Sequence, residues 1–142
     1  MLVYFSEDDK VRARALLWQN VKEYNSDTVH KVMDRIYYVY DHDVQFFKDW
    51  ALENGYLYKW EQNAKSERYL NIDGQPVRKD LYVDLEIHNL PYAPYLDTFK
   101  YYNVYKGRFS NTDRFSFDYI LVQSNGEYER QPEPEDFYED EN

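Results

Sequence analysis

The segment LYVDLEIH, residues 81–88, carries the clearest strand pattern of the chain. Apolar and polar positions alternate along it: Leu81, Val83, Leu85 and Ile87 against Tyr82, Asp84, Glu86 and His88. A period of two places one set of side chains against a core and the other set in solvent. The segment therefore predicts a half-buried strand within an antiparallel sheet.

The same period recurs on both sides of this strand. Further strands are predicted at residues 56–61, 68–72, 98–105 and 115–123. Three turn signals separate them: Asp73-Gly74 with Pro76 at its exit, Lys106-Gly107, and Asn125-Gly126. The first turn is expected to join residues 68–72 to residues 81–88. Two prolines make residues 90–95 an extended loop, and the whole predicts a mostly antiparallel, meandering sheet of five or six strands.

Ahead of the sheet, apolar residues recur at helical spacing. After a short edge strand at residues 2–5, the positions Val11, Ala15 and Trp18 define the buried stripe of a helix predicted over residues 7–24. Ser6 is its expected N-cap. The connection that follows is brief, so we expect this helix to pack antiparallel to the next one.

A second helix is predicted over residues 27–54. Its stripe steps by three or four residues through Val29, Met33, Ile36, Tyr40, Val44, Phe47 and Ala51. Asp41-His42-Asp43 either caps and divides this helix or faces solvent within one bent helix, and the unbroken stripe favours one helix. Gly55 is the expected C-terminal stop. The predicted fold class is α+β: two N-terminal helices as an antiparallel pair, then the sheet, then an acidic tail.

Length and composition predict one domain that needs no covalent staple. The 142 residues suffice for a single core, expected over residues 1–130, with a tail over residues 131–142. The absence of cysteine excludes disulfides, thiolate zinc sites and cysteine nucleophiles, and is compatible with a reducing cytosol. The N-terminal residues lack a basic leader, and no apolar run approaches the ~18 residues of a membrane span. We expect an intracellular, cytoplasmic protein.

Negative charge is concentrated at the C-terminal end. The formal net charge is −10, and residues 127–142 hold eight of the 27 acidic residues against one basic residue. These acids are Glu127, Glu129, Glu133, Glu135, Asp136, Glu139, Asp140 and Glu141. Residues 131–142 also lack apolar periodicity, which is typical of an extended or disordered tail. A field of one sign at one end indicates a basic partner, although acidic tails also serve solubility alone.

The acidic residues have a spacing that relates them to nucleic acid. Alternate residues of an extended strand lie roughly 7 Å apart, and phosphates along one DNA strand lie about 3.4 Å apart. Glu127 and Glu129, or Glu133 and Glu135, would then meet every second phosphate-binding position of a basic groove. Many acidic strands share this spacing, so it is a loose correspondence.

Aromatic residues make up 20% of the chain, and residues 92–114 interleave them with basic residues. The candidate contact residues there are Tyr92, Tyr95, Lys100, Tyr101, Tyr102, Tyr105, Lys106 and Arg108. Aromatic faces beside cations suit stacking on single-stranded nucleic acid. They equally suit a protein interface rich in tyrosine and arginine. The net charge disfavours direct nucleic-acid binding, because phosphate contacts require positive surface.

No pattern of catalytic or metal-binding residues is recognisable. The histidines His30, His42 and His88 form no pair at the i, i+4 spacing of a helical zinc site. The four glycines are all assigned to caps or turns, which leaves no phosphate-binding loop and no nucleophile elbow. Paired carboxylates such as Asp84 and Glu86 fit a solvated strand face. The sequence therefore predicts no catalytic residue, no metal and no cofactor.

These patterns favour a small non-enzymatic protein-binding module, an inhibitor or adaptor that occupies the basic, nucleic-acid-binding surface of a partner such as a nuclease. In composition and size it is analogous to DNA-mimicking anti-defence proteins of phages and mobile elements. An alternative is a single-stranded nucleic-acid binder that uses residues 92–114. A third is an enzyme without a sequence motif, which a deep pocket holding a carboxylate or histidine with a shifted pKa would indicate.

Overall fold

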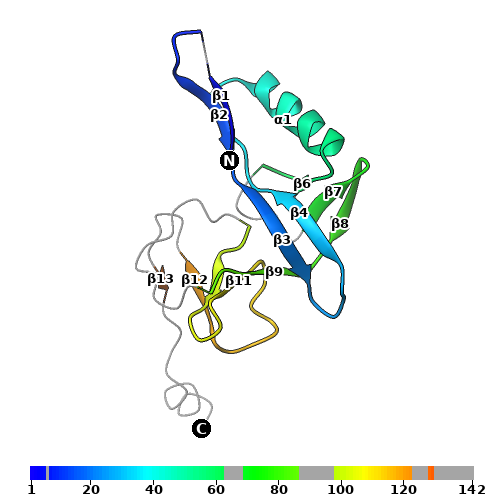
Figure 1. Cartoon of the computed structure of the whole chain (residues 1–142), viewed down its shortest axis with the longest axis vertical. Coiled ribbons are helices and arrows are strands. Elements are labelled where there is room, and N and C mark those ends of the chain that lie inside the picture. The colour runs from blue at the N-terminus through cyan, green and yellow to red at the C-terminus, as the bar shows by residue number, and fades with distance from the viewer. Residues whose placement is uncertain (6, 63–68, 87–97, 123–127, 130–142) are drawn as a thin grey trace.

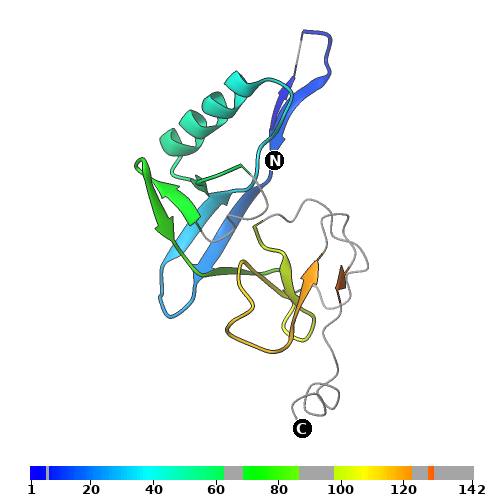
Figure 2. The same cartoon turned by 180° about the vertical axis from the view of Figure 1, so that it is seen from behind.

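The computed structural model describes residues 1–5, 7–62, 69–86, 98–122 and 128–129, and the fold is given for these. They form thirteen strands and one helix, α1 (Asp41–Glu53). The described part of the chain is therefore mainly β (Figures 1 and 2). None of its helices is long and apolar enough to cross a membrane.

A three-stranded sheet lies at one end of the molecule, beside α1 (Figure 1). It consists of β1 (Leu2–Phe5), β2 (Val11–Ala15) and β5 (Tyr37–Tyr38), in the order β1-β2-β5 with antiparallel pairing. The register of β1 on β2 shifts between Tyr4 and Phe5: Tyr4 lies opposite Ala13, whereas Phe5 lies opposite Val11. Arg12 is therefore the extra residue of a β-bulge, a feature that redirects a side chain.

The second sheet has ten strands in the order β13-β12-β10-β11-β9-β3-β4-β6-β7-β8. Their bounds are β3 Leu17–Glu23, β4 Val29–Met33, β6 Leu57–Lys59, β7 Tyr69–Ile72, β8 Gln75–Arg78, β9 Leu81–Asp84, β10 Tyr101–Asn103, β11 Arg108–Ser110, β12 Tyr119–Val122 and β13 Tyr128–Glu129. The pairings of this sheet are antiparallel except that of β4 with β6, which α1 connects as a parallel crossover.

The β3–β4 hairpin separates two hydrophobic cores. Met33 packs with Phe47 and Ala51 of α1 on one face. Val32, its neighbour in β4, packs with Phe99 and the strands β9–β11 on the other. Successive side chains of a strand point to opposite faces, so two consecutive apolar residues are both buried here.

The predicted α+β fold with two N-terminal helices is wrong. Residues predicted as a helix over 7–24 form β2 and β3, and those from 27 to 40 form β4, β5 and their connection. The apparent stripe joined residues of different cores, since Ala15 belongs to the core under α1 while Trp18 packs against the other. In β4 the consecutive residues Val32 and Met33 are both buried, which removed the alternation of a half-buried strand there. The many valines and tyrosines of residues 11–40 favour strands, a preference that the spacing argument ignored.

The helix that remains begins where the acidic cluster stands. α1 starts at Asp41 with Tyr40 as its N-cap, so Asp41-His42-Asp43 divides the predicted long helix instead of lying within it. The C-terminal stop is confirmed, because Asn54 is the C-cap and Gly55 follows with a φ of 75°. The edge strand at residues 2–5 is also confirmed as β1.

Predictions for the sheet are confirmed at its turns and corrected in its connections. Asp73 and Gly74 form a turn at positive φ, but they join β7 to β8 and not to β9. Pro76 lies within β8, an edge strand, where its missing N–H costs no pairing. The strand predicted at 81–88 ends at Asp84, and Glu86 follows with a φ of 56°. The sheet has ten strands instead of five or six because short strands such as β11 carry too few residues to show a period.

Several predicted features lie outside the described residues: Ser6, the loop at residues 90–95, His88, the turn Asn125-Gly126 and the tail at 131–142. Their structural predictions stay predictions.

Glu23 fastens the end of β3 to two other segments, and its titration tests that role. Its Oε1 accepts hydrogen bonds from His30 Nε2 at 2.9 Å and Lys79 Nζ at 3.1 Å. Burial alone would raise the pKa of Glu23, but the hydrogen bonds and charges of His30 and Lys79 outweigh it and lower the pKa below its ordinary 4.5. The folded state therefore favours the ionised form of Glu23 more than the unfolded state does.

We expect Glu23→Gln to cost of order 1 kcal/mol of unfolding free energy at pH 7. The contribution is present above pH 4.5, the unfolded value, and is lost as the pH falls through the lowered folded value. Urea unfolding of the wild type and the Glu23→Gln variant between pH 7 and pH 3.5 measures this loss: their unfolding free energies should converge at low pH. Glu53→Gln, at an exposed site at the end of α1, is the control. A Glu23→Gln deficit that stays constant over this range would contradict the assignment.

Candidate functional site

Five side chains form one continuous series of ring and cation contacts, and we call them the aromatic–arginine ladder: Arg114, Phe115, Tyr24, Tyr82 and Arg108. Tyr82 and Arg108 belong to β9 and β11, Tyr24 follows β3, and Arg114 and Phe115 lie between β11 and β12. The Arg114 guanidinium lies 4.8 Å from the Phe115 ring centroid. Phe115 and Tyr24 are stacked at 3.9 Å with ring planes 8° apart, and Tyr24 lies 4.7 Å from Tyr82. The Arg108 guanidinium lies 4.0 Å above the Tyr82 ring. The Tyr24 and Tyr82 ring planes are tilted by 48°, so cation–π contacts lie at both ends of a row of three rings in contact.

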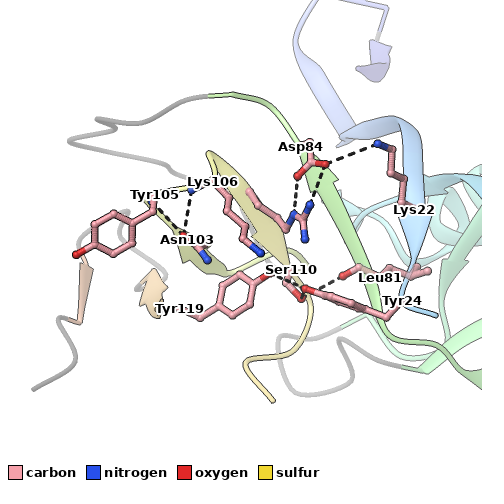
Figure 3. A network of polar contacts seen from close by, with 10 residues as sticks. Lys22, Tyr24, Leu81, Asp84, Asn103, Tyr105, Lys106, Ser110 and Tyr119 are labelled. Atoms are coloured by element: carbon pink, nitrogen blue, oxygen red, sulfur yellow. Dashed lines mark hydrogen bonds and ion pairs between the residues drawn. The ribbon is translucent and has the colours of Figure 1, made fainter. Parts of the chain in front are cut away.

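Carboxylates hold both arginines in place. Arg108 donates from Nε to Asp84 Oδ1 at 2.6 Å and from a terminal nitrogen to Oδ2 at 3.2 Å, the two-pronged geometry that fixes a guanidinium plane (Figure 3). Lys22 Nζ lies 3.7 Å from the same carboxylate. Arg114 pairs with Asp80 at 2.5 Å. Burial alone would lower the pKa of Arg108, but the hydrogen bond and charge of Asp84 raise it, so the guanidinium stays charged.

A chain of hydroxyl groups anchors the inner side of the ladder (Figure 3). Tyr24 donates to Ser110 Oγ at 3.1 Å, and Ser110 donates to the Leu81 carbonyl at 3.2 Å. Each hydroxyl has one proton, so the Tyr119 hydroxyl, 2.5 Å from that of Tyr24, is the donor in their contact. Burial raises the pKa of Tyr24 above its ordinary value, so its hydroxyl stays protonated. The central ring of the ladder is thereby fixed in position.

The predicted aromatic and basic contact residues occupy different environments. Tyr105, 74% exposed, and the exposed Lys106 lie in the β10–β11 turn, where Asn103 Oδ1 accepts both backbone N–H groups (Figure 3). Arg108 belongs to the ladder. Tyr102 is only 1% exposed and stacks on Phe109 in the core, so its ring is not available to a partner. Lys100 and Tyr101 are half-buried, and Tyr92 and Tyr95 lie outside the described residues.

One predicted acidic contact residue lies within the described part of the chain. Glu129 is in β13 and pairs with Leu121 of β12. The others lie outside the described residues: Glu127, Glu133, Glu135, Asp136, Glu139, Asp140 and Glu141. β13 is the terminal strand of the ten-stranded sheet, so Glu129 lies on an edge strand beside β12.

Sequence reasoning missed three members of the ladder. Tyr24 and Tyr82 meet because β3 pairs with β9, a contact between distant segments that no local pattern encodes. Phe115 comes from the connection that precedes β12. One signal was available: Tyr82 and Asp84 stand on the polar side of residues 81–88, where they form an exposed aromatic–acidic pair suited to an arginine.

Asp34 is a buried carboxylate with a shifted pKa, the sign expected of an enzyme without a sequence motif. Its oxygens accept from Trp18 Nε1 at 3.0 Å, the Arg35 backbone N–H at 2.7 Å and Thr98 Oγ1 at 2.5 Å. Burial raises the pKa of Asp34, although these hydrogen bonds and the charge of Lys59 oppose the rise. The cavity beside it holds only about 30 Å³, the space of a water molecule or two. These donors give Asp34 a structural role between strands.

Metal binding and known relatives give no further assignment. Among the described residues, no three histidine, aspartate or glutamate side chains gather as a metal site would require. Comparison of the chain with protein-family models, with curated proteins and with solved structures finds no match. The ladder and the acidic segment are therefore interpreted from their own chemistry.

The Tyr24→Phe variant tests the hydroxyl chain while keeping the stacked ring. It removes one partner each from Tyr119 and Ser110, both buried, so the expected cost is about 1–2 kcal/mol of unfolding free energy in urea denaturation. Tyr105→Phe makes the same chemical change at an exposed ring and should cost close to nothing. Equal effects in the two variants would contradict the proposed anchoring.

Proposed function

We propose that this protein is a non-enzymatic protein-binding module that acts inside the cell as an inhibitor or adaptor. Its acidic C-terminal segment, residues 127–142, and the aromatic–arginine ladder together occupy a basic, nucleic-acid-binding surface of a partner protein, in the manner of a DNA-mimicking anti-defence inhibitor. The observation that carries the proposal is the ladder, an ordered aromatic surface in the same sheet that ends at the first acidic strand, β13.

The composition of the ladder supports a protein partner. Tyrosine, phenylalanine and arginine are enriched in the cores of protein interfaces. The rings are already in contact with one another and the guanidinium groups already paired, so little side-chain entropy remains to be lost on binding. Tyr105, in the β10–β11 turn that precedes Arg108, adds a large exposed ring.

The charge distribution supports a basic partner over nucleic acid. Residues 98–114 carry a formal charge of +3, but Arg108 is bound to Asp84 and Arg114 to Asp80. These two cations already have carboxylate partners, which lowers the positive potential that a phosphate backbone would meet. The negative charge of residues 127–142 repels a phosphate backbone and attracts a basic surface. A partner surface that normally holds phosphates complements both features.

The acidic segment is tested by neutralisation in the full chain. The variant replaces Glu135, Asp136, Glu139 and Asp140 by their amides, and the matched control does the same at the exposed acids Asp27, Asp49, Glu53 and Asp73. Partners captured from host lysate are identified by mass spectrometry, purified, and assayed for binding to a labelled DNA duplex. The wild type and the control should displace the DNA, whereas the variant should need at least tenfold more protein. Displacement should weaken at high salt, since exposed charges are screened.

Two results would overturn this proposal. One is equal competition by the variant and the control. The other is direct binding of the purified chain to a single-stranded oligonucleotide that becomes tighter in the neutralised variant, which would favour the alternative nucleic-acid binder.

The ladder is tested separately with Phe115→Ala. Phe115 is 37% exposed and forms the outer ring of the stack, so its removal should weaken partner affinity at least tenfold in the same competition assay. Trp60→Ala removes a ring of equal exposed fraction outside the ladder and should leave affinity unchanged. Loss of affinity in both variants would contradict a specific role of the ladder, because any exposed ring would then contribute to binding.

A further inference from the structure

A second surface lies at the other end of the molecule, between the tip of the β1–β2 hairpin and the start of α1 (Figures 1 and 2). We propose that it binds a basic amphipathic segment of a partner protein, one that presents apolar side chains flanked by lysine or arginine. This surface is independent of the ladder and the acidic C-terminal segment, so the molecule has two binding ends.

The β-bulge prepares this surface by redirecting Arg12. The side chain reaches α1, where Nε and a terminal nitrogen donate to Asp43 at 3.2 and 3.0 Å. Its guanidinium also lies 4.8 Å from the Tyr4 ring and 4.7 Å from the Tyr40 ring. It donates to His42 Nε2 at 2.9 Å, because arginine has no acceptor. These contacts of Arg12 fix the β1–β2 hairpin against the start of α1.

An open cleft of about 760 Å³ lies beside Arg12. Its lining includes Val11, Val39 and Tyr40, each at least half exposed. Two more exposed apolar residues adjoin it, since Phe5 lies opposite Val11 in the sheet and Phe46 packs near Tyr4. Apolar side chains gathered in this way mark a surface that a partner covers.

The charges around the cleft identify the kind of partner. Residues 7–12 and 39–43 hold five carboxylates and two cations. Both cations already have carboxylate neighbours, Arg12 with Asp43 and Lys10 with Asp8. The excess is carried by the exposed Glu7, Asp9 and Asp41. A cleft lined by apolar side chains together with Glu7 and Asp8, with further carboxylates nearby in sequence, complements an amphipathic segment whose polar face is basic. Arg12 between Tyr4 and Tyr40 shows that the local rings accept a guanidinium.

The test uses a defined probe and the full chain in which Glu135, Asp136, Glu139 and Asp140 are neutralised, so that the C-terminal segment does not capture the probe. The probe is a fluorescent 14-residue leucine–lysine helical peptide, with a leucine–glutamate peptide of the same pattern as its counterpart. Binding is followed by anisotropy and mapped by amide chemical shifts. The leucine–lysine peptide should bind with shifts centred on residues 7–12 and 39–46, and the leucine–glutamate peptide should not bind.

Paired variants make the test specific. Val39→Ser with Phe46→Ser should weaken peptide binding at least tenfold, while Val29→Ser with Leu52→Ser should not. The control residues have similar exposed fractions, 58% and 53% against 67% and 56%, and they lie at the start of β4 and the far end of α1. Asp9→Asn with Asp41→Asn should also weaken binding, while Asp27→Asn with Glu53→Gln should not.

Three outcomes would overturn the inference. Equal losses in the cleft and control pairs would mean that binding is unspecific, and shifts centred on another surface would place the site elsewhere. Self-association of the unliganded chain that Val39→Ser with Phe46→Ser abolishes would mean that a second copy covers the surface. None of these results bears on the competition assay for the acidic segment, because the four acids that assay tests are neutralised throughout.

Discussion

The β3–β4 hairpin has to be covered on both faces, and the rest of the structure depends on this requirement. Val32 and Met33 are consecutive and neither exposes any surface. One covering layer cannot bury both, because they point to opposite faces. α1 supplies one layer, and Phe99 with the strands β9–β11 supplies the other. The two binding ends proposed for the molecule follow from these layers, since α1 forms a wall of the Arg12 cleft and β9 and β11 carry Tyr82 and Arg108 of the ladder.

Local chemistry made part of the fold predictable from the sequence. Asp73-Gly74 and Gly55 stand where positive φ is required, and residues 81–84 alternate because one face of β9 is wetter than the other. Residues 7–40 were not predictable in the same way. There, apolar residues that pack into two different cores produced a combined spacing that imitates a helix. Strand propensity, and the alternation of Val11, Ala13 and Ala15 with two arginines in β2, pointed to the observed structure.

The candidate site was predictable where its residues are neighbours in sequence. Tyr105, Lys106 and Arg108 share one hairpin, so an interleaved pattern identified them together. The environment of each predicted residue depended on contacts that the local pattern does not show. Asp84 of β9 binds Arg108, and Tyr102 is buried in the core, where it stacks on Phe109. The ladder as a whole required the pairing of β3 with β9, which depends on the global fold. Charge balance between arginine and aspartate is therefore a property of the assembled sheet.

The strand order of the large sheet also has a consequence for synthesis. β3 is made early but takes its second neighbour, β9, only after α1 and four further strands have been made. A nascent chain therefore exposes an unpaired strand edge with valine and tryptophan side chains over that interval, and such edges associate with other chains. Slow translation between residues 24 and 81 would prolong the exposure. The yield of correctly assembled protein should depend on elongation rate and chaperone supply in the expressing cell.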